Sequence, residues 1–307
     1  MFFKDDIAFF KNLDVIHYIG GGYIADRWKM GMVYEYLIID IAKKINPDLK
    51  IIGTGLGLGP FRNKIFLFFL KGFLNKFDYL FLREQLSFEL CRKLNIKAHI
   101  KCCGDDALLL FPLFRDLRCK QTKFTNRSVG FNLKNFPDYN YVKIKKDIEK
   151  LLNLLQTENF EIKYFCFGQD PGPDDYDTLL NLNLRLPKDL PIYNPYRQGF
   201  FEFVKTLSKI SFGIGFAYHF NTILSIMGIP SIAIYTGDYY KQKVTGGMNF
   251  FNNFSYVLDI NNIQKSVNLV KDLISMEKEH QNQKVEELYN NMLVEYISMY
   301  RIIIKKK

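Results

Sequence analysis

Residues 213–243 read GIGFAYHFNTILSIMGIPSIAIYTGDYYKQK and predict a strand, a helix and a second strand. The first apolar strand ends at Gly215. The helix that follows ends at Gly228, because glycine favours the left-handed conformation found at many helix ends. Pro230 then begins the second apolar strand. Strands that alternate with helices pair in parallel within one sheet, so this stretch indicates an α/β fold.

The same alternation runs through most of the chain. In the first half, DVIHYIGGG, KIIGTGLGLGP, FDYLFLRE and HIKCCGDDALL are predicted strands with helical stretches between them. A second series begins at SVGFNLK, after a polar stretch over residues 117–127 that we interpret as a linker. We therefore predict a Rossmann-like domain over residues 1–120, a second one over 126–275, and a C-terminal helix with a basic tail over 276–307.

Composition limits the class of protein. The chain has 307 residues, and 48% of them are hydrophobic, which is enough for the cores of two domains. A net charge of +10 suits anionic partners such as phosphorylated small molecules, lipid-linked intermediates or a membrane surface. The lysines are scattered and form no aromatic–basic box, so nucleic acid is not an expected partner. The 5 cysteines include no C-x-x-C pair, which predicts free thiols and no zinc site.

The ends of the chain bear on its location. The segment MFFKDDIAFF carries charges where a signal peptide needs an apolar region, and the apolar run IFLFFL is too short to cross a bilayer. We therefore expect a cytoplasmic protein, with the inner face of the membrane as a further location. The tail RIIIKKK is interpreted as a solvated end, and weak peripheral membrane contact is the alternative.

Candidate site residues follow the predicted strand ends, where ligands bind in such folds. His219 falls in the first turn of the helix within residues 213–243, where free N–H donors and the helix dipole favour an anion. A lone helical histidine is also often a satisfied core residue, and that alternative stays open. Arg83 follows another strand, where it either binds a phosphate or carboxylate or pairs with Glu84, Asp105 or Asp106.

Two glycine-rich segments are candidates for close approach to a ligand. IGGGYIAD places Gly20, Gly21 and Gly22 directly after a strand, and Asp26 follows as a residue that orients a hydroxyl. GTGLGLGP contains Gly55 and Gly57, and we interpret it as a ligand-lining loop, with a merely flexible loop as the alternative. Pro60 breaks the spacing of a dinucleotide-binding fingerprint in this segment.

Taken together, these segments resemble the polysaccharide pyruvyl transferase family. The segments DVIHYIGGGYIAD, IIGTGLGLGP, YLFLREQLSFELCRKLNI, CGDDALL, SVGFNLK and YHFNTILSIMGIPSIAIY occur in the family's order, from about residue 14 to residue 243. The resemblance implies a fold like that of the two-domain GT-B glycosyltransferases. It also implies the transfer of pyruvate from phosphoenolpyruvate to a sugar of a surface polysaccharide, or of its lipid-linked precursor, to form a ketal. No metal and no cofactor beyond this donor are expected.

The resemblance also assigns roles to residues. The catalytic residues are expected to be His219, Asp26 and Asp105, the donor-binding residues Arg83, Lys134, Tyr218, Lys241 and Lys243, and the cleft-lining residues Gly20, Gly21, Gly22, Gly55 and Gly57. Ala217 stands where the family's Arg-x-His motif has arginine, so Lys134, Arg197 or Lys241 is expected to compensate. Only a short segment precedes Gly20, and we expect a first domain that is shortened at its start.

Two other functions remain open at this stage. The first is a GT-B glycosyltransferase that uses a nucleotide sugar, because its site also needs phosphate donors at a helix N-terminus. The second is a non-catalytic sugar-binding or scaffold subunit of envelope-polysaccharide assembly, which the alanine at position 217 and the short first domain favour. Neither the acceptor sugar nor the oligomeric state is predicted.

Overall fold

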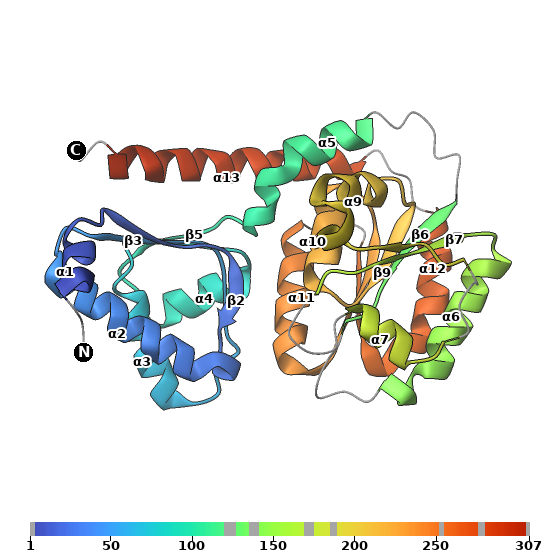
Figure 1. The fold of residues 1–307 in the computed structure, drawn as a ribbon, viewed down its shortest axis with the longest axis horizontal. Helices are drawn as coiled ribbons and strands as arrows, with labels where there is room; N and C mark the ends of the chain where they lie inside the picture. Colours follow the sequence, from blue (N-terminus) through green and yellow to red (C-terminus); the bar gives the residue numbers. More distant parts are fainter. Residues whose placement is uncertain are drawn as a thin grey trace. The chain divides into compact units, whose positions relative to one another are not determined.

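The computed structural model describes residues 4–119, 127–134, 141–168, 175–184, 189–251, 255–275 and 280–304. It confirms the α/β class, with two parallel sheets and a long C-terminal helix (Figure 1). The chain divides into two compact units, Met1–Leu108 with Leu288–Lys307, and Leu109–Glu287. The first unit therefore ends before the predicted boundary at residue 120, and it also takes in the last part of the C-terminal helix.

The first unit is built on a five-stranded sheet. Its strands are β1 (Val15–Tyr18), β2 (Gly21–Ile24), β3 (Lys50–Leu58), β4 (Tyr79–Leu82) and β5 (His99–Cys102). The order is β1-β3-β4-β5, with β2 paired to β3, and every pair is parallel. The helices of this unit are α1 (Lys4–Lys11), η1 (Asp26–Trp28), α2 (Lys29–Ile45), α3 (Lys64–Leu74), α4 (Gln85–Lys93) and η2 (Asp106–Leu110).

The connections determine which face of this sheet each helix covers. From β1 to β5 every crossover steps in the same direction across the sheet, and such crossovers are right-handed. Helices α2, α3 and α4 therefore lie on one face, as Figure 1 shows. They pack on a core that includes Leu80 and Leu82, and the intervening Phe81 points to the other face.

The C-terminal helix α13 (His280–Ile304) covers that other face with its last part. The rings of Phe81 and Tyr296 stack with their centroids 5.3 Å apart. Lys101 Nζ and a Glu295 carboxylate oxygen form an ion pair of 3.0 Å beside them. The end of α13 is therefore part of the first unit and not a separate tail.

The interpretation of GTGLGLGP as a loop is wrong. Residues Lys50–Leu58 form one nine-residue strand, and the glycines make room for side chains that lie across it. A Cβ atom at Gly55 would lie 2.7 Å from Cγ of Asp106, and one at Gly57 would lie 2.4 Å from the Arg83 guanidinium. Gly55 also has a φ of +59°, a conformation that side chains disfavour.

Two other local expectations need correction. The sequence predicts DVIHYIGGG as one strand that ends in three glycines, but β1 ends at Tyr18, and Gly21 and Gly22 open the short strand β2. Serine is a favoured N-cap residue, so the sequence SFELCRKLNI predicts that α4 begins with Ser87 as its N-cap. It begins at Gln85, because Glu84 already has extended backbone at the N-cap position.

The second unit is built on a six-stranded parallel sheet of order β11-β10-β9-β6-β7-β8. Its strands are β6 (Ser128–Asn132), β7 (Glu161–Phe165), β8 (Ile192–Tyr193), β9 (Phe212–Gly215), β10 (Ser231–Tyr235) and β11 (Tyr256–Asp259). The direction of the strand order reverses between β6 and β9. In open α/β sheets such a reversal creates a crevice at the carboxyl ends of the two strands, where ligands bind.

Helices cover both faces of this second sheet. The described helices of this unit are α5 (Phe111–Cys119), η3 (Tyr141–Lys143), α6 (Lys145–Thr157), α7 (Asp175–Asn181), α8 (Pro195–Gln198), α9 (Phe200–Leu207), α10 (Tyr218–Ile226), α11 (Gly237–Phe251), η4 (Ile260–Lys265) and α12 (Ser266–Ser275). Helix α10 follows β9, so its first turn lies at the reversal. This is the strand–helix–strand unit that the sequence predicts over residues 213–243.

Candidate functional site

Helix α10 places His219 at the surface. His219 is the second residue of the helix, where backbone N–H groups have no partner within the helix. Every other residue of α10 is buried, whereas His219 is exposed. This exposure excludes the alternative in which His219 is a packed core residue.

Two other predicted donor-binding residues lie beside His219. The rings of Tyr218 and His219 are 5.2 Å apart, and Lys243 of α11 places its Nζ 5.0 Å from the centre of the Tyr218 ring. A Cβ atom at Gly247 would lie 2.6 Å from that ring, so glycine lets the two helices close on it. Lys241 is exposed on α11, but side chains two residues apart on a helix do not face the same way.

Asn132, the last residue of β6, holds the start of α10 in place. The Asn132 side-chain oxygen accepts a hydrogen bond of 2.7 Å from the Ala217 N–H, directly before the helix. The Asn132 amide donates to Phe165 O at 2.8 Å and to Asp175 Oδ2 at 3.1 Å. Asn132 was not predicted as a site residue, because nothing in its local sequence shows that it reaches three other elements.

The carboxylate of Asp175, which accepts a hydrogen bond from Asn132, is buried. It is 1% exposed and accepts hydrogen bonds from the N–H groups of Phe167 at 2.7 Å and Gly168 at 2.9 Å. Burial raises the pKa of Asp175, although these hydrogen bonds and the positive charge of Lys134 act in the opposite direction. Lys134, a predicted donor ligand, therefore lies near a carboxylate that the sequence did not single out.

The raised pKa of Asp175 has a measurable consequence. A carboxyl group whose pKa is higher in the folded chain stabilises the fold below its unfolded pKa of about 3.9, and this stabilisation is lost as the pH rises through the folded pKa. Asparagine cannot ionise, so the melting temperature of Asp175→Asn should rise relative to wild type as the pH increases from about 4. Parallel melting curves for the two proteins over this range would contradict the assignment.

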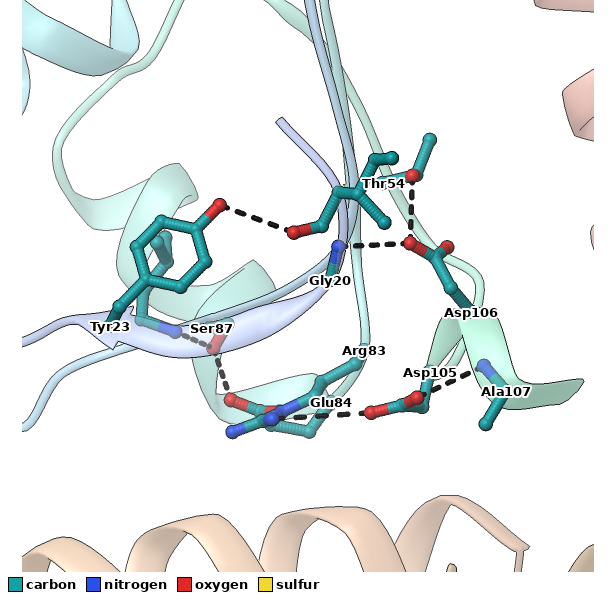
Figure 2. Close-up of polar contacts among 11 residues, drawn as sticks. Gly20, Tyr23, Thr54, Arg83, Glu84, Ser87, Asp105, Asp106 and Ala107 are labelled. Atoms are coloured by element: carbon teal, nitrogen blue, oxygen red, sulfur yellow. Dashed lines mark hydrogen bonds and ion pairs between the residues drawn. The ribbon is translucent and has the colours of Figure 1, made fainter. Parts of the chain in front are cut away.

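At the carboxyl edge of the first sheet, Arg83 forms a buried ion pair (Figure 2). Its side chain is 3% exposed, its Nε lies 2.6 Å from Glu84 Oε2, and its Nη1 lies 4.0 Å from Asp105 Oδ2. Ser87 Oγ donates to Glu84 Oε1 and accepts a hydrogen bond of 2.7 Å from the Leu58 N–H. Of the two alternatives for Arg83, the structure shows the ion pair.

The adjacent acids have different surroundings. Asp105 accepts a hydrogen bond of 3.0 Å from the Ala107 N–H and so caps η2. Asp106 instead joins three segments, because it accepts from the Gly20 N–H at 2.9 Å, from Thr54 Oγ at 2.9 Å and from the Tyr296 hydroxyl. Figure 2 shows Gly20 and Thr54 converging on it.

Hydrogen bonding continues from Asp106 to a histidine that the sequence did not single out. Thr54 gives its one hydroxyl proton to Asp106, so His17 Nε2 is the donor in its 2.8 Å bond to Thr54. His17 Nδ1 then accepts from the Tyr300 hydroxyl at 3.3 Å. Burial lowers the pKa of His17, although the charge of Asp106 opposes this.

Asp26 lies at the same sheet edge and holds the segment after β3. Its Oδ2 accepts a hydrogen bond of 2.6 Å from the Arg62 N–H, and its own N–H donates to Pro60 O at 3.2 Å. Its Oδ1 is buried and has no hydrogen-bond partner among the residues that the structure describes. Next to it, Gly21 leaves room for the Tyr23 ring, which would lie 2.7 Å from a Cβ atom.

Other sequence predictions concern thiols, metals and membranes. Cys91, Cys102, Cys103 and Cys166 are free thiols, as predicted, while the side chain of Cys119 lies outside the described residues. Burial raises the pKa of Cys91 and Cys103 to about 12.

Within the described ranges, no three His, Cys, Asp or Glu side chains gather as a metal site. No helix in that part of the chain has the length and apolar character needed to cross a membrane.

Solved structures with the same architecture span nearly the whole chain. A glycosyltransferase from Rickettsia africae aligns over 99% of this chain and 83% of its own, with a TM-score of 0.60 and 14% identity. A putative UDP-N-acetylglucosamine 2-epimerase from Listeria monocytogenes aligns over 97% and 77%, with a TM-score of 0.58 and 13% identity. Sucrose-phosphate synthase from Thermosynechococcus elongatus aligns over 95% and 74%, with a TM-score of 0.55 and 13% identity. These likenesses show the GT-B-like fold.

Sequence comparison identifies the family. No curated protein gives a significant sequence match to the chain. The family model described as polysaccharide pyruvyl transferase matches residues 2–239, which include the two glycine-rich segments, Arg83 and His219. The match extends over well more than half of the 307 residues. The chain therefore belongs to the polysaccharide pyruvyl transferase family.

Proposed function

We propose that the chain transfers pyruvate from phosphoenolpyruvate to two hydroxyl groups of a sugar, which forms a ketal and releases phosphate. The observation that carries this proposal is His219, the one exposed residue of an otherwise buried helix whose first turn lies at the reversal of the second sheet. Family membership supports the transferase class. The proposed setting is the cytoplasm, with a sugar or a lipid-linked saccharide as the acceptor.

The reaction defines what such a site must supply. A proton has to reach C3 of phosphoenolpyruvate, which leaves C2 with oxocarbenium character. One sugar hydroxyl then adds to C2 and loses its proton. Phosphate departs with the electrons of its C2–O bond, and the second hydroxyl adds to C2 and loses its proton. The site therefore needs an acid, a cationic clamp for phosphate and carboxylate, and a group that orients hydroxyls.

The second unit offers the acid and the clamp. His219 is the proposed acid or phosphate ligand, and the positive end of the α10 helix dipole favours an anion beside it. Lys243 holds its ammonium group over Tyr218, next to His219. Lys134 and Lys241 are proposed as further donor ligands, and Lys134 has the position for it near Asp175 at the end of β6.

The first unit offers groups that orient an acceptor. Asp26 is the proposed hydroxyl-orienting group, because one of its carboxylate oxygens has no hydrogen-bond partner among the described residues. The oxygens of Asp106 are already engaged by Gly20, Thr54 and Tyr296, so Asp106 has a positioning role. We assign the same positioning role to Asp105 and Arg83, which pair near the same edge.

Thermal unfolding in the presence of candidate donors tests the proposal. A ligand that binds only the folded chain adds about 2.7 kcal/mol to the free energy of unfolding at one hundred times its dissociation constant. Phosphoenolpyruvate should raise the melting temperature, and inorganic phosphate should do so at higher concentration. Stabilisation by uridine or guanosine sugar nucleotides alone would favour a glycosyltransferase. No response to either donor class would favour a non-catalytic subunit.

A further inference from the structure

Helices α2 and α3 run side by side in the same direction. Lys29 Nζ lies 5.3 Å from the centre of the Phe66 ring, and further along, Lys76 pairs with Asp40. Between these contacts, a Cβ atom at Gly72 would lie 3.2 Å from the Tyr36 ring. The outer faces of the two helices therefore form one continuous surface of the first unit.

This surface is unusually apolar for one exposed to water. Its exposed large side chains, with their exposed fractions, are Trp28 (52%), Met30 (65%), Tyr34 (69%), Leu37 (52%), Ile65 (64%) and Phe68 (76%). We call these six residues the α2–α3 surface. Met30, Tyr34 and Leu37 are spaced four and three residues apart, which puts them on one stripe of α2. Grouped exposed side chains of this kind mark an interaction site.

The exposed charges on this surface are all positive. Lys29, Lys64 and Lys71 are exposed on the two helices, and Arg27 and Arg62 are exposed in the segments that lead into them. No acidic residue is exposed in residues 26–45 or 61–74, both of which the structure describes throughout. The binding partner that complements such a surface has negatively charged groups at its boundary with water and an apolar layer beneath them.

We propose that the α2–α3 surface binds the face of a membrane that contains anionic lipids. Aromatic and aliphatic side chains enter the boundary between headgroups and acyl chains, and basic residues pair with the anionic headgroups. Trp28 suits this position, because tryptophan favours the membrane–water interface. This inference goes beyond the pyruvyl transfer proposed above and does not rest on it.

The position of the surface relates it to the candidate site. Trp28 and Lys29 lie two and three residues after Asp26, and the Arg62 N–H donates to Asp26 at the carboxyl edge of the sheet. The membrane-binding surface thus begins at the edge that carries Gly20 and Asp106. An acceptor sugar on a lipid carrier would reach this edge without leaving the membrane.

A second copy of the chain is a weaker occupant. In a two-fold dimer each α2–α3 surface meets its own copy, so the exposed cations would face one another without acidic partners.

The expected membrane site also differs from the one suggested by the sequence. That suggestion placed weak membrane contact on the tail RIIIKKK, whose last three residues lie outside the described ones.

The emission of Trp28 tests the proposal directly, because it is the chain's only tryptophan. Vesicles of phosphatidylcholine and phosphatidylglycerol should shift the emission to shorter wavelength, whereas pure phosphatidylcholine should not. Lipids with brominated acyl chains should quench Trp28, and salt should reverse binding. Absence of a shift and of quenching with anionic vesicles overturns the proposal. No donor or acceptor is present, so failure here is independent of the pyruvyl transfer.

Matched variants locate the contact. A basic residue near an anionic bilayer strengthens binding about fivefold, so Lys29→Gln with Lys64→Gln should weaken vesicle binding about 30-fold. The control is Arg92→Gln with Lys93→Gln, an equal loss of charge on exposed positions of α4. Equal weakening by both pairs overturns the assignment to this surface.

A second pair of variants tests the apolar part. Phe68→Ser should weaken binding, whereas Leu86→Ser, an exposed apolar residue on α4, should not. Both positions are exposed, so both variants should fold, and melting curves check this. Light scattering completes the test. A dimer that Phe68→Ser abolishes, in a protein that ignores anionic vesicles, would assign the surface to a second copy and overturn the proposal.

Discussion

Replacing His219 with alanine is expected to lower turnover by about 10²- to 10⁴-fold, the contribution of a positioned acid or base, at an unchanged melting temperature. The unchanged stability follows from the exposure of His219 on α10, where a smaller side chain leaves no cavity. His219→Gln should retain part of the affinity for phosphoenolpyruvate through its amide and should recover little turnover. Melting temperature and turnover are measured on the same preparation.

A second exposed histidine provides the control for this experiment. His99 begins β5, so it lies at the amino edge of the first sheet, away from the carboxyl edge. His99→Ala should therefore leave turnover unchanged. A His219→Ala protein that keeps full turnover would remove His219 from the proposed mechanism.

Replacing Arg83 with alanine is expected to lower the free energy of unfolding by about 3–5 kcal/mol. The substitution leaves the carboxylate of Glu84 buried without the guanidinium that lies 2.6 Å from it. Removal of both charges in Arg83→Met with Glu84→Gln should restore most of this stability, because a buried ion pair contributes little beyond a well-packed neutral pair. Chemical denaturation of the single and double variants measures the coupling between the two residues.

The same variants decide whether Arg83 has a second role. Because the guanidinium of Arg83 is buried against Gly57, the main expected effect of Arg83→Ala is a loss of stability. If Arg83→Ala kept the stability of the wild type but lost its response to phosphoenolpyruvate, Arg83 would be a donor ligand after all. The buried ion pair would then be incidental to the fold.

Much of the fold can be predicted from local pattern. The strand–helix–strand unit at residues 213–243 has its strands and its helix where the apolar runs and the glycines indicate. The nine-residue strand β3 was missed in part because glycine weakens the interior of a strand. Here they seat Asp106 and Arg83, which lie far along the chain, so their structural reason is invisible in the local sequence.

The candidate site was predictable only as a set of strand ends. His219 and Lys243 are predicted as site residues because both follow strands of the second unit. The sequence did not indicate that Asp106, rather than Asp105, joins Gly20, Thr54 and Tyr296. Adjacent aspartates have the same local pattern. They are distinguished by the pairing of the strands, which brings Gly20 and Thr54 to Asp106, and by the return of the C-terminal helix to the first sheet.

That return determines the order in which the chain can fold during synthesis. The second unit is one continuous segment, Leu109–Glu287, and it can fold as soon as it has emerged from the ribosome. The first unit lacks the helix that covers Phe81 until residues 288–307 follow. At about 5–20 residues per second, translation of the intervening segment takes roughly 10–40 s. The unit whose synthesis begins first is thus completed last, and the face of its sheet that carries Phe81 waits uncovered for that time.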